Sequence, residues 1–140
     1  MTNTSIIIGA GLPNGIGGAT ALRFAAEGLH VIVSGRTQAK LDQTVSQIRA
    51  AGGSAEAFVA DVTSAGDLSA LFDRARRLGQ PVSSVVYNAG NNHMMSFAEL
   101  SAEDFEANWR VCCFAGFLTA KLAMPILSEQ GFGSLIFTGA

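Results

Sequence analysis

The N-terminal segment restricts the fold more than any other part of the chain, because an apolar run leads directly into a glycine-rich turn. Ile6–Ile8 is a run of β-branched residues, which predicts a short buried strand, Ile6–Gly9. The turn Gly9–Gly17 (GAGLPNGIG) follows, and a helix-like segment runs from Gly15 to about Glu27. A helix N-terminus beside such a turn offers unpaired N–H groups and a positive dipole end to a pyrophosphate. Glycine suits this turn because a Cβ would keep a phosphate away from the backbone.

Apolar segments and helix-like segments alternate along the rest of the chain. Further strands are expected at His30–Ser34, Ala55–Ala60, Val82–Tyr87 and Ser134–Thr138. Apolar strands separated by helices indicate a parallel sheet covered on both faces. Because connections between parallel strands are right-handed, a doubly wound α/β sheet is the expected fold. The 140 residues predict one domain, 1–140, since no linker or internal repeat interrupts them.

Capping residues indicate where two of the later helices begin. Ser64 is followed by Asp67 and Ser101 by Asp104, a spacing typical of helix N-termini. The helix after Ser101 is expected to reach about Glu129, with a kink or an end at Pro125. Its predicted core-facing stripe consists of Val111, Phe114, Ala115, Leu118 and Leu122.

The end of the second expected strand bears on which cofactor binds. An NAD-binding fold, or a methyltransferase, would place an acidic residue there for a ribose diol, about 20 residues past the glycines. This chain has Gly35-Arg36 instead. The planar fork of an arginine pairs well with a 2′-phosphate, so the sequence favours NADP(H) over NAD(H). A solvated Arg36 at a helix start is the alternative. A P-loop is excluded, since no Gly-Lys-Ser/Thr follows the turn.

Four motifs occur in order at the ends of the expected strands: Gly11-x-x-x-Gly15-Ile16-Gly17, Gly35-Arg36, Asp61-Val62 and Asn88-Ala89-Gly90. Together they resemble the short-chain dehydrogenase/reductase family over essentially the whole chain. The resemblance implies a Rossmann-type sheet with five strands in the order 3-2-1-4-5, the family's C-terminal strands being missing. It implies that the dinucleotide is contacted by Gly11, Asn14, Gly15, Ile16, Gly17, Arg36, Asp61, Val62, Asn88, Ala89 and Gly90.

Two of these residues have a structural alternative. Asp61 could accept a hydrogen from the adenine amino group, or it could cap the next helix. Asn88 could contact the cofactor, or it could hold the exit of the fourth strand by bonding to neighbouring backbone. The small residues Ala89-Gly90 would leave room for the ribose and the nicotinamide.

The family's reaction is hydride transfer at a carbonyl or alcohol, and the resemblance implies a Ser-Tyr-Lys-Asn set for it. No Tyr-x-x-x-Lys occurs here, and the only tyrosine, Tyr87, is expected to pack in the fourth strand. Cys112 stands where the asparagine is expected, and it is predicted to be a buried, inert side chain. Thr138 is no convincing replacement for the serine. No catalytic residue is therefore predicted on this chain, which alone is expected to be inactive.

The segment after the Asn-Ala-Gly motif could contribute to a substrate site. His93 could donate a proton to a carbonyl, since histidine titrates near neutrality, or it could be a surface loop residue. Met94, Met95 and Phe97 could line an apolar pocket or cover the core.

Composition narrows the partners and the compartment. The net charge is −2 and no basic stripe stands out, so nucleic acid is not expected. The N-terminus lacks the cationic region of a signal peptide and its apolar run is too short for a membrane span, so no membrane partner is predicted. Cys112 and Cys113 are adjacent, without metal-site spacing, and fit a reducing cytoplasm.

Two main hypotheses for function remain. In the first, the chain is the NADP(H)-binding part of an incomplete oxidoreductase that takes a small carbonyl or alcohol substrate and is a homo-oligomer at full length. In the second, it is a non-catalytic dinucleotide-binding or protein-interaction module derived from the family. Incompleteness is favoured because Leu135, Ile136 and Phe137 would otherwise form an open apolar sheet edge.

Overall fold

A five-stranded parallel sheet forms the centre of the molecule. The computed structural model describes residues 2–90 and 94–139. The strands lie in the order β3-β2-β1-β4-β5, and every neighbouring pair is parallel. This confirms the predicted sheet order, and the strand bounds differ from the predicted ones by one or two residues. The strands are β1 (Thr4–Ile8), β2 (His30–Gly35), β3 (Ser54–Val59), β4 (Val82–Tyr87) and β5 (Ser134–Phe137).

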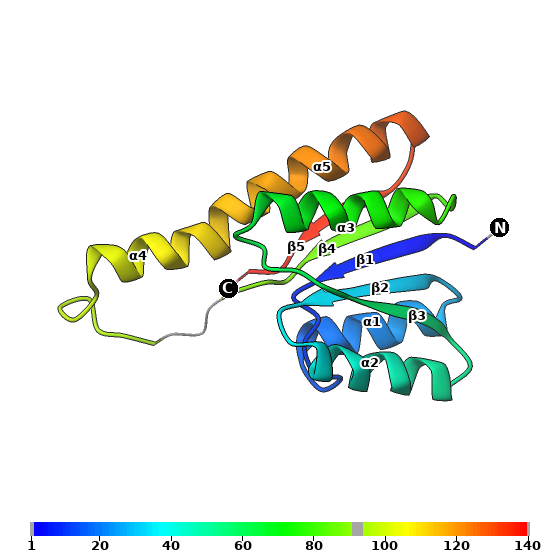
Figure 1. Cartoon of the computed structure of the whole chain (residues 1–140), viewed down its shortest axis with the longest axis horizontal. Helices are drawn as coiled ribbons and strands as arrows, with labels where there is room; N and C mark the ends of the chain where they lie inside the picture. Colours follow the sequence, from blue (N-terminus) through cyan, green and yellow to red (C-terminus); the bar gives the residue numbers. More distant parts are fainter. Residues whose placement is uncertain (1, 91–93, 140) are drawn as a thin grey trace.

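Helices cover both faces of the sheet, as Figure 1 shows. Helices α1 (Ile16–Ala26) and α2 (Gln38–Ala50) lie on one face, and α3 (Ala65–Arg77) and α5 (Ala115–Gln130) lie on the other. Helix α4 (Ala102–Trp109) projects beyond the sheet and has no buried residue. The sheet and its two helical layers therefore form the doubly wound fold expected from the sequence.

The core is divided into two clusters by the sheet, and β1 contributes to both. Ile6 and Ile8 belong to the cluster on the side of α3 and α5, whereas Ile7 belongs to the cluster on the side of α1 and α2. All three side chains are at most 1% exposed. A central strand buried on both faces explains why its sequence is apolar throughout rather than alternating.

Both predicted helix caps are present. The Ser64 Oγ accepts a hydrogen bond of 3.2 Å from the Asp67 N–H, and the Ser101 Oγ accepts one of 3.1 Å from the Asp104 N–H. The Asp67 carboxylate does not complete the capping box on Ser64, because it accepts from the backbone N–H of Asp61 at 2.9 Å. Helix α3 is thereby connected directly to the loop that leaves β3.

The long C-terminal helix differs from the prediction at Pro125. The helix continues through this residue to Gln130. Pro125 is exposed, so the one backbone hydrogen bond that proline removes lies on a side that water can reach. The irregularity occurs upstream instead, where the π-helical turn η1 (Arg110–Phe114) joins α4 to α5.

The buried face of α5 includes most of the predicted stripe but extends beyond it. Ala115 is buried as expected, whereas Phe114, Leu118 and Leu122 are only partly buried. The fully buried positions are mostly small, which lets the helix lie close to the sheet: Ala115, Gly116, Thr119, Ala123, Ile126 and Leu127. The larger stripe residues Val111, Leu118 and Leu122 pack against the core at its margin, and the small residues beside them lie closest to the sheet.

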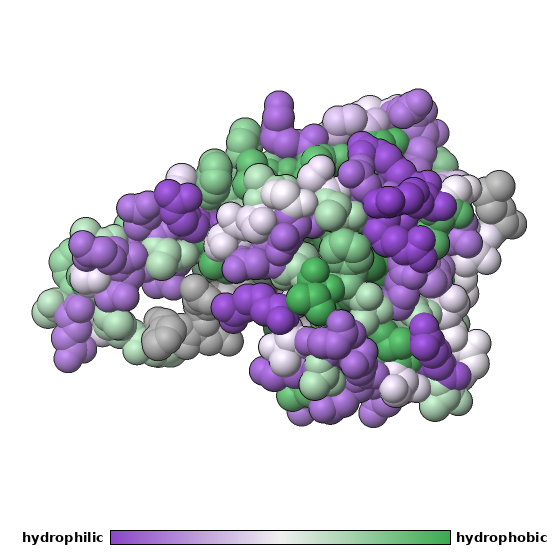
Figure 2. All heavy atoms as spheres, in the orientation of Figure 1, coloured by the Kyte–Doolittle hydropathy of each residue, from purple (hydrophilic) through white to green (hydrophobic). Residues whose placement is uncertain are grey.

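Much of this helix is apolar and exposed. The continuous helical stretch Ala102–Gln130 is long and apolar enough to cross a membrane by length and composition alone, and 28% of its most apolar window is buried. In Figure 2, hydrophobic surface gathers where α4 passes into α5. Exposed apolar surface of this kind is typical of faces that pack against another apolar surface.

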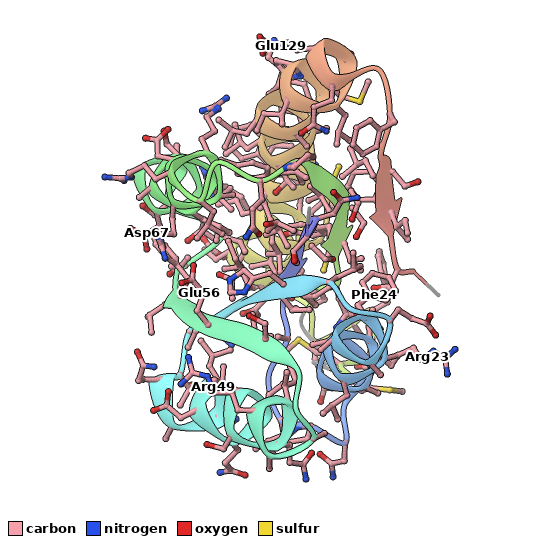
Figure 3. All side chains as sticks on the ribbon, turned by 90° about the vertical axis from the view of Figure 1, so that its right-hand side faces the viewer. Arg23, Phe24, Arg49, Glu56, Asp67 and Glu129 are labelled. Atoms are coloured by element: carbon pink, nitrogen blue, oxygen red, sulfur yellow. The ribbon has the colours of Figure 1, made fainter. Side chains whose placement is uncertain are left out.

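The two edges of the sheet are built differently. At the β3 edge, Glu56 accepts two hydrogen bonds from Arg74, at 2.9 and 2.7 Å. From the opposite face of the sheet, Arg49 of α2 donates to the backbone carbonyl of Ala55 at 2.8 Å (Figure 3). At the β5 edge, Ile136 is 41% exposed and Phe137 52% exposed. This confirms the open apolar edge that the sequence predicted.

Candidate functional site

A cleft of about 770 Å³ lies at the carboxyl edge of the sheet. Residues that follow four different strands line it, which is where open α/β sheets bind ligands. Helix α2 and the region around η1 complete its walls. The lining consists of Gly9, Gly11, Gly35, Arg36, Thr37, Lys40, Leu41, Ala60, Asp61, Val62, Thr63, Asn88, Ala89, Gly90, Ala107, Arg110 and Val111.

The structure brings seven of the predicted cofactor-binding residues together around this cleft: Gly11, Arg36, Asp61, Val62, Asn88, Ala89 and Gly90. The other four, Asn14, Gly15, Ile16 and Gly17, belong to the same turn but are not among the cleft's lining residues. Asn14, Gly15 and Ile16 are exposed at the start of α1, whereas Gly17 is buried.

The glycines of the turn are required mainly by the protein's own packing. A Cβ on Gly9 would lie 2.5 Å from the backbone nitrogen of Ala89, and one on Gly17 would lie 2.4 Å from the carbonyl oxygen of Gly9. Gly9 and Gly11 also have φ values of +83° and +58°. Gly17 is thus required by the turn itself, because a side chain there would meet the backbone of Gly9.

Gly15 and Gly18 show the two possible uses of a glycine here. A Cβ on Gly15, the N-cap of α1, would meet nothing closer than 3.5 Å. A Cβ on Gly18 would lie 2.1 Å from the carbonyl oxygen of Leu12. The sequence prediction did not include Gly18, although the adjacent pair Gly17-Gly18 at a helix start was a visible signal. Gly15 therefore leaves the helix N-terminus open, and Gly18 closes the turn against the helix.

Asp61 is held in place by the loop that it begins. Its Oδ1 accepts hydrogen bonds from the hydroxyl of Thr63 at 2.7 Å and from the Thr63 N–H at 2.9 Å. These bonds, with the nearby positive charge of Arg36, hold the pKa of the Asp61 carboxyl below its usual range. The N-cap of α3 is Ser64, so the capping alternative for Asp61 is wrong. Its Oδ2 makes no hydrogen bond within residues 2–90 and 94–139.

Asn88 connects the ends of three strands. Its Nδ2 donates to the carbonyl of Gly9 at 3.0 Å, and its Oδ1 accepts from the Thr138 hydroxyl at 2.7 Å. Its backbone N–H donates to the Ile8 carbonyl at 2.8 Å. Both ends of the side-chain amide are engaged within the protein, which establishes the structural alternative proposed for this residue.

Tyr87 is buried and takes part in the wall of the site. Its hydroxyl donates to the backbone carbonyl of Val111, within η1. Burial raises the pKa of the Tyr87 phenol above its ordinary value, with a smaller contribution from Cys112. A phenol that holds its proton this firmly packs and donates but does not exchange a proton near neutrality. The prediction that Tyr87 packs in the fourth strand is confirmed.

Cys112 lies in the π-helical turn, and the prediction that it is buried is wrong. Both Cys112 and Cys113 are exposed and unbridged. The reason is the helix around them, because α4 has no buried residue and η1 only skirts the sheet. π-helical turns are rare and occur often at functional sites. Cys112 is thus placed in an unusual backbone segment whose neighbours, Arg110 and Val111, line the cleft.

The segment after Gly90 adds little to the described site. His93 lies outside the described residues. Met94 is 98% exposed and Phe97 is 92% exposed, so neither of them covers the core.

The sequence matches the short chain dehydrogenase family over residues 3–140. The chain belongs to this family. The 7alpha-hydroxysteroid dehydrogenase of Escherichia coli K12 is a relative with 35% identity over 133 residues, which are 94% of this chain and 51% of that protein. The chain spans about half the length of the curated relatives that it matches first. Short-chain dehydrogenases are oxidoreductases that bind a nicotinamide dinucleotide.

Solved structures of the family agree with this fold. A 7α-hydroxysteroid dehydrogenase complexed with NADH and 7-oxo glycochenodeoxycholic acid superposes with a TM-score of 0.90 at 32% identity, covering 99% of this chain and 53% of that one. An actinorhodin polyketide ketoreductase with NADPH gives a TM-score of 0.89 at 28% identity, covering 97% of this chain and 52% of that one. Short-chain dehydrogenases similar to this chain thus include complexes with either dinucleotide.

Proposed function

We propose that this chain is the NADP(H)-binding part of a short-chain dehydrogenase/reductase that transfers a hydride between the nicotinamide and a small carbonyl or alcohol substrate. The observation that supports NADP(H) is the end of β2, where Arg36 lines the cleft in place of a carboxylate. A guanidinium there pairs with a 2′-phosphate, whereas a carboxylate would accept from the ribose hydroxyls of NAD.

The remaining predicted residues fit the other parts of a dinucleotide. Asn14, Gly15 and Ile16 form the exposed, acid-free start of α1, which suits the pyrophosphate. Gly11 and Gly17 shape the turn that holds this start. Asp61 has its Oδ2 free for the adenine amino group, and Val62 is its apolar neighbour.

The nicotinamide end would lie beside the exit of β4. Ala89 and Gly90 are small and line the cleft, and Asn88 fixes the backbone that precedes them. The side chains that line the whole cleft include Arg36, Lys40 and Arg110 but only one carboxylate, Asp61. An excess of positive charge suits a ligand that carries several phosphate charges.

The cofactor, when bound, supplies the hydride chemistry, and this chain's residues bind and orient it. The proton-transferring tyrosine and lysine of the family have no match in these 140 residues, and Cys112 replaces the asparagine. We therefore expect no measurable carbonyl reduction by this chain alone. Turnover of a test ketone with NADPH would contradict this proposal.

The decisive experiment is a fluorescence titration of the chain with NADPH and with NADH. NADPH is expected to bind more tightly, and Arg36→Ala is expected to weaken NADPH by about tenfold to a hundredfold with little effect on NADH. Arg23→Ala is the matched control, because Arg23 pairs with Glu27 on α1 and points into solvent (Figure 3). Equal affinities for the two dinucleotides would refute the role of Arg36.

A non-catalytic dinucleotide-binding or protein-interaction module is the second candidate. The exposed Cys112 at the asparagine position favours it, since a thiol is a poor replacement in a proton relay. The coding sequence beyond Ala140 separates the two candidates, because a Tyr-x-x-x-Lys there would support the enzyme.

We further propose that the full-length protein is a homo-oligomer, with the helix Ala102–Gln130 at its interface rather than in a membrane. Trp109, Phe114 and Phe117 stack in a row on this helix, and the helix also carries the apolar groove around Met124 and Pro125. An antiparallel second copy would place each row in the other's groove. Phe117→Glu is expected to reduce the molar mass measured by light scattering. Exposed unpaired thiols at Cys112 and Cys113 agree with a cytoplasmic location.

A further inference from the structure

We propose that Lys40 is a second determinant of NADP(H) specificity, acting with Arg36 as a two-cation site for the 2′-phosphate. This inference depends on the proposed function and deepens it. Arg36, Thr37 and Lys40 line the same corner of the cleft, at the exit of β2 and the first turn of α2.

The charges in this corner show what a second cation adds. The positive charge of Arg36 acts on the carboxylate of Asp61, which lines the same cleft. Arg36 and Asp61 together are formally neutral, whereas a phosphate monoester carries about −1.5 to −2 charges at neutral pH. Asp61 therefore offsets part of the attraction that Arg36 offers to the phosphate. Lys40 makes the corner positive.

Neither cation is used elsewhere in the protein. Within residues 2–90 and 94–139, Arg36 and Lys40 make no hydrogen bond or ion pair through their side chains. The four ion pairs of the described chain instead use Arg23, Arg74, Arg76 and Arg110. Two basic side chains of like charge that share a cleft without partners are stabilised when an anion binds between them.

The start of α2 shares with α1 the lack of a side-chain cap and of an acidic first turn, and it differs from α1 in carrying a lysine. Helices α3 and α4 have a serine N-cap that accepts a backbone hydrogen bond, and acidic residues in the first turn. Helix α2 has Thr37 at its N-cap without a side-chain capping bond, no acidic residue in its first turn, and Lys40 within that turn. A lysine there opposes the helix dipole, so the arrangement costs helix stability that an anion would restore. The free Thr37 hydroxyl is a further donor beside the two cations.

The test uses a fragment that carries the 2′-phosphate and one that lacks it. Binding of 2′,5′-ADP and of 5′-AMP to the 140-residue chain is measured by calorimetry for the unchanged chain, Lys40→Gln and Lys40→Arg. Lys40→Gln is expected to weaken 2′,5′-ADP about fivefold to tenfold and to leave 5′-AMP unchanged, and Lys40→Arg is expected to restore binding. Lys121→Gln, on the exposed side of α5, is the charge-matched control.

The outcomes separate this inference from the proposed function. Unchanged 2′,5′-ADP affinity in Lys40→Gln, or equal losses for both nucleotides, would overturn the role of Lys40 while leaving NADP(H) binding intact. If the unchanged chain binds neither the fragments nor NADPH, the proposed function fails as well. A lower salt dependence of 2′,5′-ADP binding in Lys40→Gln than in the unchanged chain would support the two-cation site.

Discussion

The two edges of the sheet, β3 and β5, have similar backbones and opposite protection. At the β3 edge, Arg49 occupies an edge carbonyl and Arg74 holds Glu56 in a two-point ion pair, so charged groups cover the strand. At the β5 edge, Ile136 and Phe137 are exposed without such cover. Charged edges resist pairing with another chain, and flat apolar edges invite it. The comparison shows that the protection of an edge strand depends on its neighbours as well as on its own sequence. At β3, helices α2 and α3 supply the arginines that cover the strand.

The largest effect expected from this comparison is association of the 140-residue chain through β5. Ile136→Lys should raise the monomer fraction measured by light scattering, because a charge on the edge disfavours pairing. Val59→Lys makes the same change on β3, where Val59 is 45% exposed, and should alter the monomer fraction little. A clean monomeric melt of the unchanged chain at high Tm, without a scattering signal, would contradict the prediction.

A smaller effect, on the free energy of unfolding, is expected at Asn88, which connects the end of β5 to the glycine turn. Asn88→Ala removes the bonds to the Gly9 carbonyl and the Thr138 hydroxyl, and should lower the free energy of unfolding by about 1–3 kcal/mol. Thr138→Val removes the bond to Asn88 and the long 3.5 Å contact with the Tyr87 carbonyl but keeps the bond to Gly9, and should cost about 0.5–1.5 kcal/mol. Urea titration of both variants measures the difference. Equal losses would show that the bond to Gly9 contributes nothing.

The smallest effect is a pH dependence confined to the protected edge. His30 begins β2, and its Nδ1 is 2.7 Å from the Ser54 Oγ at the start of β3. Burial is the main reason why the pKa of His30 is lowered. The charge of Glu56 opposes this effect, and the charges of Arg74 and Arg49 add smaller contributions to the lowering. The Nε2 is buried without a partner, which disfavours the doubly protonated ring.

Because the folded chain has the lower His30 pKa, the unfolded chain takes up the proton first as pH falls. Stability from the neutral ring is therefore present above about pH 6.5 and is lost as pH falls through the folded pKa. Urea unfolding between pH 7.5 and 5 should show a slope that His30→Gln reduces. An unchanged slope in His30→Gln would assign the dependence to other groups.

The sequence predicted the strands and the doubly wound sheet because these depend on local apolar runs and on the fixed geometry of parallel crossovers, whereas the strand order followed from the family resemblance. It did not predict which glycine contacts which backbone. Gly18 is needed because a Cβ there would lie 2.1 Å from the Leu12 carbonyl oxygen in the folded turn. This close approach cannot be read from the sequence. The partners of Asp61 were missed for a similar reason. From the sequence, Thr63 or Ser64 could each have capped α3, and only the structure shows that Ser64 caps the helix while Thr63 bonds to Asp61.

Cys112 was predicted wrongly because the prediction treated the last helix as one regular element with a single buried face. The π-helical turn η1 changes the register in its middle, so the small residues from Ala115 onward meet the sheet and Cys112 does not. A single backbone insertion of this type has no reliable signature in composition or periodicity.

The bond from Tyr87 to the Val111 carbonyl has a consequence for the shape of the cleft. Val111 and Arg110 form the wall that faces the strand ends, and α4 beyond them has no buried residue to hold it. The Tyr87 hydroxyl and the packing of Val111 against the core together hold this wall to the sheet. A buried side chain that is not among the cleft's lining residues thus contributes to the position of its wall.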